Sequence, residues 1–253
     1  MKKYDIIYSI GRDCACSEYL NKNGLRISSG PFDWLTNANF EERFKLLLND
    51  FKDFLNPEDF IILKKDPLVL NDNNCDYYEN KNTNFYFYHD FPINIDFSDS
   101  FNDVKEKYLR RIDRFYLNVK NKDRVLLVWF SHYHSTDDKI VIDNCNEFCK
   151  KLDKNIDFLI IEHDEKLFEH QIENKKIAKN ITRINLRTIK LDLSGNITTM
   201  GNEECCNKIF SEYKLITPLS FRVKRGLKKT GIKLICLFIP IKKWRKKLRS
   251  VGY

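Results

Sequence analysis

Residues 4–35, YDIIYSIGRDCACSEYLNKNGLRISSGPFDWL, decide how this chain folds. The opening of the stretch, residues 4–10, is rich in β-branched and aromatic side chains, which predicts a strand. Asp13 is a good N-cap residue, so a short helix is expected over residues 14–20. Cys14 would then lie in the first turn of a helix that directly follows a buried strand.

Cys14 is therefore the candidate nucleophile, with Cys16 as the alternative. Free backbone N–H groups and the positive end of the helix dipole are expected to lower the pKa of the thiol there. Both cysteines could instead be small buried residues that pack the corner between strand and helix. The Cys-x-Cys spacing differs from the Cys-x-x-Cys of redox and zinc sites, and we expect neither a metal nor a cofactor.

His89 is the leading candidate for the base that takes the thiol proton. It lies near the end of a strand predicted at 85–91, and sites of α/β proteins gather at strand ends. Asp90 follows it, but neighbours in a strand point to opposite faces. Asp33 is thus an equally plausible carboxylate to orient the imidazole. The alternative is that His89 is an ordinary half-buried histidine.

Other histidines compete for the same role. His132 and His134 follow a near-continuous apolar strand predicted at 124–131. As a pair they could also ligate a metal, but no third ligand stands at a suitable spacing. His163 and His170 lie among acidic residues, which predicts surface positions.

Two further groups are candidates for substrate binding. Trp34 follows a Gly-Pro turn and could form a pocket wall or, equally, a plug of the core. Arg110, Arg111 and Arg114 fall on one face of a helix predicted at 101–119. Such a cluster can bind a phosphate-bearing substrate, although it can also be a solvent-facing stripe.

Several short motifs carry a resemblance. They are SIGRDCAC at 9–16, GLR at 24–26, PFDWL at 31–35, FYHDF at 87–91 and KYLRRIDR at 107–114. In this order they resemble a bacterial family described as papain-like cysteine peptidases. The resemblance covers roughly the first half of the chain and implies a cysteine-centred α/β protein, with proteolysis as the family's description.

The whole chain of 253 residues, 42% of them hydrophobic, can bury a sizeable core. In the second half, predicted strands and helices alternate, which favours parallel strands joined by crossovers. We therefore predict an α/β fold with one domain, residues 1–217, whose mostly parallel sheet is flanked by helices. Residues 71–84 are predicted to form a polar loop. The predicted elements of the second half are strands at 124–131, 156–161 and 180–186 and helices at 139–152 and 202–213.

The end of the chain, residues 218–253, is predicted to be a basic amphipathic tail. All 36 acidic residues but only 32 of the 44 basic ones lie in residues 1–221, so the remaining 12 positive charges belong to residues 222–253. An apolar run, LICLFIPI at 234–241, interrupts these charges. This composition suits attachment to an anionic inner-membrane surface, and it does not resemble a nucleic-acid-binding face. Without a signal peptide or a spanning apolar run, the chain is expected to be cytoplasmic and peripheral to the inner membrane.

Two classes of function follow. The first is a thiol enzyme, either a peptidase or an acyltransferase that acts in surface polysaccharide biosynthesis on a glycan substrate. The alternative is a glycosyltransferase-like or non-catalytic accessory protein of capsule or lipopolysaccharide assembly. In that case the cysteines would be structural, and eight free thiols are what a reducing compartment allows.

Overall fold

The computed structural model describes residues 1–65, 74–133, 136–192, 195 and 198–216. These belong to a compact body, Met1–Lys214, and to the first residues of a second unit that begins at Leu215. The tail predicted at 218–253 lies outside the described residues. Within them, no helix combines the length and apolarity needed to cross a bilayer.

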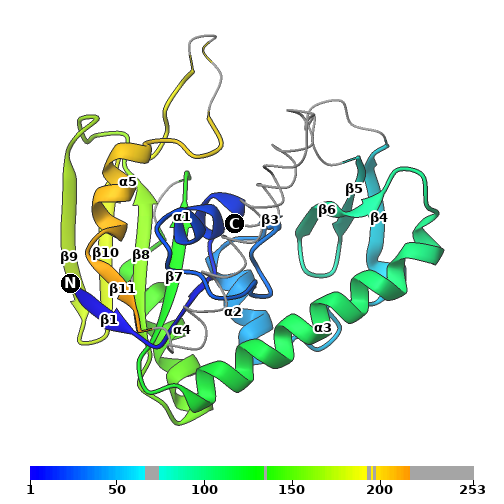
Figure 1. The fold of residues 1–253 in the computed structure, drawn as a ribbon, viewed down its shortest axis with the longest axis horizontal. Coiled ribbons are helices and arrows are strands. Elements are labelled where there is room, and N and C mark those ends of the chain that lie inside the picture. The colour runs from blue at the N-terminus through cyan, green and yellow to red at the C-terminus, as the bar shows by residue number, and fades with distance from the viewer. Residues whose placement is uncertain (66–73, 134–135, 193–194, 196–197, 217–253) are drawn as a thin grey trace, which may run out of the picture. The chain divides into compact units, whose positions relative to one another are not determined.

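The larger sheet has five strands in the order β2-β7-β8-β10-β9 (Figure 1). The first four run parallel, and β9 pairs antiparallel with β10 at the edge. The predicted α/β class is thus confirmed, with a sheet that is mixed and not purely parallel. The strands are β2 (Ile6–Ser9), β7 (Val125–Ser131), β8 (Asp157–His163), β10 (Ile181–Leu186) and β9 (Ile172–Ala178).

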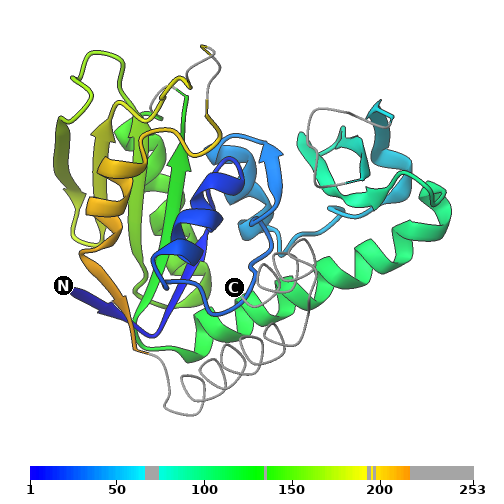
Figure 2. The ribbon, with the colours of Figure 1, turned by 45° about the horizontal axis from the view of Figure 1, so that its top comes forward.

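Helices cover both faces of this sheet. Figures 1 and 2 show α1 and α5 side by side on one face, with α4 on the other. On the first face, the Tyr19 ring of α1 packs against Phe130 of β7 and Phe210 of α5, with ring centres 5.5 and 5.6 Å apart. The helices are α1 (Cys14–Lys22), α2 (Phe40–Leu48), α3 (Phe97–Asn121), α4 (Asp138–Leu152) and α5 (Glu203–Phe210).

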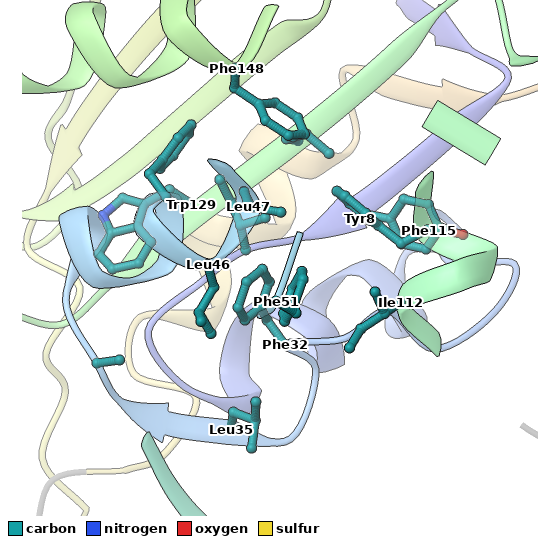
Figure 3. Close-up of a cluster of buried hydrophobic side chains, with 14 of the residues drawn as sticks. Tyr8, Phe32, Leu35, Leu46, Leu47, Phe51, Ile112, Phe115, Trp129 and Phe148 are labelled. Atoms are coloured by element: carbon teal, nitrogen blue, oxygen red, sulfur yellow. The ribbon is translucent and has the colours of Figure 1, made fainter. Parts of the chain in front are cut away.

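The core lies on the side of the sheet that faces α2 and α4 (Figure 3). Every second residue of the strands points there, as the period of a strand requires. Trp129 of β7 meets Phe40 of α2 edge-on at 5.3 Å, and Tyr8 of β2 packs on Phe115 of α3 at 5.1 Å. Fully burying such a ring contributes roughly 2–3 kcal/mol, so these contacts hold the helices in register with the sheet.

A second sheet of four antiparallel strands, in the order β3-β6-β5-β4, shares this core. The long helix α3 leads from it back to β7 (Figure 1). Its strands are β3 (Leu35–Asn37), β4 (Phe60–Lys64), β5 (Cys75–Asn80) and β6 (Phe85–Pro92). The described residues also form a short helix, η1 (Pro57–Asp59), and a two-stranded sheet of β1 (Lys2–Tyr4) and β11 (Tyr213–Leu215).

Strand β5 corrects the prediction of a polar loop at 71–84. Its partners come from the neighbouring strand: Tyr77 packs on Tyr88 at 4.4 Å, and Tyr78 packs on Phe91 at 4.7 Å. Cross-strand aromatic pairs of this kind stabilise a sheet even where the local sequence is rich in Asn and Asp. The local composition could not reveal them.

Candidate functional site

One cavity lies at the carboxyl edge of the parallel strands, where ligands of open α/β sheets bind. The loops that follow β2, β7, β8 and β10 all contribute to it, and strands β3 and β6 of the second sheet complete it. Its volume is about 510 Å³. It is lined by Asp13, Cys14, Thr36, Tyr88, His89, His132, Tyr133, His163, Glu165, Ile189, Thr198 and Thr199.

Cys14 occupies the predicted place, the first residue of α1 after the turn that ends β2. Asp13 caps the helix, and its carboxylate accepts a hydrogen bond from the Ala15 N–H at 2.9 Å. The direction of the pKa shift, however, was predicted wrongly. Burial and then the nearby Asp13 carboxylate raise the pKa of Cys14 to about 11, and they outweigh its own backbone N–H, which lowers it. The resting thiol is therefore protonated at neutral pH.

Cys16 lies away from the cavity. It is fully buried, and its thiol donates to the Val128 carbonyl at 3.4 Å. A Cβ on Gly11 would stand 2.4 Å from its Cβ, so the glycine is what lets the turn close over it. Burial raises the pKa of Cys16 as well. This cysteine packs the corner between strand and helix and has no access to a substrate.

His89 lines the same cavity as Cys14, from strand β6 of the other sheet. Its ring meets the indole of Trp34 edge-on, with ring centres 5.6 Å apart. Burial lowers the pKa of His89, although the neighbouring Asp90 partly opposes the shift. A neutral imidazole at pH 7 can accept a proton, as a general base must.

The two carboxylates predicted to orient His89 have other partners. Asp90 is buried and accepts hydrogen bonds from the hydroxyl of Tyr108 at 2.9 Å and from the ammonium of Lys107. Asp33 is buried too and pairs with Arg26 at 3.1 Å. Neither carboxylate lines the cavity.

His132, the competing base, has both ring nitrogens engaged. Nδ1 lies 3.0 Å from the Thr188 hydroxyl, and Nε2 lies 3.0 Å from the Thr199 carbonyl. A carbonyl only accepts, so the proton of the neutral ring is assigned to Nε2. His132 thus ties the loop between β10 and α5 to the end of β7. Gly201 of that loop has φ +65°, and a Cβ there would meet the Thr188 carbonyl oxygen at 2.0 Å.

His163 was expected at the surface, but it is half-buried at the end of β8 and lines the cavity. Its Nδ1 accepts a hydrogen bond from the Thr188 N–H at 3.1 Å, and burial lowers its pKa. The acidic residues around it misled the prediction: Glu162 is itself buried and pairs with Arg183, and Glu165 lines the same cavity as His163. His170 is exposed as predicted, 3.8 Å from Glu204. His134 lies outside the described residues.

The predicted substrate-binding residues stand behind the cavity or apart from it. Trp34 lies between the ring of His89 and the guanidinium of Arg26, which sits 5.6 Å from the indole centre. Its indole therefore supports His89 and does not line the cavity itself.

The three arginines of α3 do not converge on one point. Arg114 donates to the Ser29 carbonyl at 2.8 Å, and Arg111 lies over the Tyr108 ring at 5.1 Å. Arg110 is exposed and pairs with Glu106 one helical turn away. Arg114 thus holds α3 against the loop at Ser29, while Arg111 contacts a ring of α3 itself.

Sequence reasoning missed several lining residues, among them Glu165, Ile189 and Thr199. Glu165 and Ile189 closely follow the carboxyl ends of β8 and β10, and that position was the available signal. The wall near Thr199 could not be foreseen, because it depends on hydrogen bonds to His132, more than 60 residues earlier.

This geometry defines an α/β protein with a cysteine and a histidine facing one cavity. The comparisons give the family. The family model described as "Putative papain-like cysteine peptidase (DUF1796)" matches residues 5–166, and the chain belongs to this family, as its motifs predicted. The matched region contains Cys14, His89, His132 and His163.

One curated relative is "Uncharacterized protein R408" of Acanthamoeba polyphaga mimivirus, 29% identical over 127 residues. The alignment covers 46% of this chain and 57% of that protein, so the chain spans little more than half of its relative's length. No solved structure matches the chain.

Proposed function

We propose that this protein is a cysteine-dependent acyl hydrolase, with Cys14 as nucleophile and His89 as base. The observation that carries the proposal is that both side chains line one cavity at the carboxyl edge of the sheet. Membership of a family described as cysteine peptidases supports the same chemistry. An amide or ester carbonyl is the group that such a pair attacks.

In the first step His89 takes the proton from the Cys14 thiol while the sulfur bonds to the carbonyl carbon. The carbonyl π bond becomes an oxyanion, which the positive end of α1 favours. The oxyanion then collapses, the bond to the leaving amine or alcohol breaks, and His89 returns the proton to that group. Water, deprotonated by His89, attacks the thioester, and the proton ends on the Cys14 sulfur as the acid is released.

The high pKa of Cys14 makes the base necessary. A thiol with a pKa of about 11 is almost entirely protonated at pH 7. Proton transfer to His89 must therefore accompany the attack, since no standing thiolate–imidazolium pair is available. Asp33 and Asp90 are held by other partners, and the edge-on packing of the Trp34 indole contributes to the orientation of the imidazole.

Hydrolysis of p-nitrophenyl butyrate and of a fluorogenic peptide panel tests the proposal. Cys14→Ala should abolish turnover, and His89→Gln should lower kcat about 10²–10⁴-fold, the usual contribution of a general base. Cys149→Ala is the matched control, because this half-buried thiol of α4 lies outside the cavity. Full activity of Cys14→Ala would overturn the proposal and favour the alternative, a glycosyltransferase-like or non-catalytic accessory protein of capsule or lipopolysaccharide assembly.

Transfer of the acyl group to a sugar hydroxyl is the second candidate, with a surface glycan precursor as acceptor. The 12 basic residues among 222–253, with no acidic one, support it, since such a segment suits an anionic membrane where these precursors are built. A full-length variant with these residues changed to Gln should leave the membrane fraction in a sedimentation assay. Unchanged partition would remove the support for transfer while leaving hydrolysis untouched.

A further inference from the structure

A second concave site lies at the opposite, amino edge of the parallel sheet. It is a cleft of about 280 Å³ between the starts of β7, β8 and β10, the end of β9, and strands β1 and β11. Basic side chains dominate its rim, and a single carboxylate lines it. The basic residues are Lys2, Lys3, Arg124, Lys176 and Lys179.

These positive charges are poorly neutralised. Among the described residues, Lys3, Lys176 and Lys179 form no ion pair, and the guanidinium of Arg124 reaches Asp5 only at 3.8 Å. The one lining carboxylate, Asp157, already accepts a hydrogen bond from the Tyr4 hydroxyl at 2.8 Å. Like charges gathered in one cleft repel one another, and a bound anion relieves that repulsion.

The accumulation is not a consequence of overall composition. Residues 1–221 carry 36 acidic and 32 basic side chains, a net charge of −4. Five basic residues against one acid in one cleft of this body therefore form a local positive potential that attracts anions. The chain's own basic tail is not a suitable occupant, because it carries charge of the same sign.

We infer that this cleft binds a phosphate-bearing anion with two or more negative charges. Its size suits a small phosphorylated group, since pockets for whole drug-sized ligands begin near 300 Å³. The stacked rings of Tyr4 and Tyr213, 6.2 Å apart, add an aromatic surface beside the lysines. The ammonium of Lys2 lies 5.5 Å from the Tyr213 ring centre, where the phenol face holds it over the cleft. This inference is independent of the thiol chemistry at the other edge.

Isothermal titration of the full-length chain with inorganic pyrophosphate tests the inference. The informative variant is Lys176→Gln/Lys179→Gln. Its matched control, Lys175→Gln/Lys190→Gln, removes two exposed charges that pair outside the cleft, Lys175 with Asp138 and Lys190 with Glu169. We expect the first pair to weaken binding about tenfold, from two exposed charge contacts, and the control less than twofold.

The source of the phosphate is distinguished by a second arm. Vesicles of phosphatidylglycerol, with phosphatidylcholine as the neutral reference, are sedimented with the same proteins. If Lys176→Gln/Lys179→Gln loses pyrophosphate binding and the control variant does not, the ligand is a soluble phosphate. If it loses binding only to the anionic vesicles, the ligand is a lipid headgroup. Equal behaviour of the two double variants in both arms would overturn the inference. Cys14-dependent turnover should stay unchanged in every variant, so a failure here is separable from a failure of the proposed hydrolase.

Discussion

The most informative perturbation is a change of pH acting on the Cys14 thiol. Burial and the Asp13 carboxylate raise its pKa from an ordinary 9.0 to about 11. At pH 8 the thiolate is then about one part in a thousand, compared with about one in ten for an ordinary cysteine. Two pKa units correspond to about 2.7 kcal/mol, so alkylation of Cys14 should be about a hundredfold slower than that of a free peptide thiol.

The assay is iodoacetamide labelling of the folded protein between pH 6 and pH 10, followed by peptide mass spectrometry of the modified cysteine. The rate should keep rising across this range. Asp13→Asn should raise it by less than tenfold, because the carboxylate is the second cause and burial the first. Asn also retains the N-cap. Glu18 contributes less than Asp13 to the raised pKa of Cys14, so Glu18→Gln should change the alkylation rate less. A plateau below pH 8 would show a preformed thiolate and refute the reasoning.

Three other predictions concern stability and the packing of the site. Gly201→Ala should destabilise the fold by about 2–4 kcal/mol in urea unfolding, because its Cβ would meet Thr188 and His132 at a positive φ. Gly24→Ala, also at positive φ but with nothing within 4 Å, should cost only about 1 kcal/mol; equal losses would contradict the packing argument. Folding lowers the pKa values of His89 and His163 below 6.5, the ordinary value of the unfolded chain. At a pH between the folded pKa and 6.5, the unfolded chain therefore binds more protons than the folded protein. The free energy of unfolding should thus fall as the pH drops from 7.5 to 5.5, and it should fall less in the double variant His89→Gln/His163→Gln. An identical pH dependence of the two proteins would refute the lowered pKa values of these histidines. Trp34→Leu should reduce kcat several-fold and shift the pH profile of kcat/KM, whereas Trp244→Leu, in the C-terminal segment, serves as the control and should change neither.

Sequence rules that involve only neighbouring residues were enough to predict the helices and strands around the Cys14 thiol. The Asp13 cap and the apolar run of β7 are properties of neighbouring residues, and the inward stripe of α3 follows from helical spacing. The position of Cys14 at the cavity follows from the rule that strand ends collect sites, whereas His89 reaches the cavity from within the antiparallel strand β6. That rule applied equally to His163, where the neighbouring acidic residues were given too much weight.

The remaining features depend on partners that are distant in the sequence. Asp90 is bound by Tyr108 of α3, 18 residues further along the chain. The burial of Cys14 is a property of the tertiary structure, so the direction of its pKa shift could not follow from helix geometry alone. Helix α2 ends at Leu48, because Asp50 and Phe51 take positive φ values, yet the Phe51 side chain still reaches the core.

The central claim is that the Cys14 sulfur forms a thioester with an acyl group while His89 accepts its proton. Rapid acid quench of the protein with p-nitrophenyl butyrate, followed by peptide mass spectrometry, observes that bond directly. We predict one hydroxylamine-sensitive butyryl group on the peptide that carries Cys14, still present in Cys149→Ala and formed at least a hundredfold more slowly in His89→Gln. A peptide that stays unmodified through many turnovers, or one acylated equally fast without His89, would contradict the account.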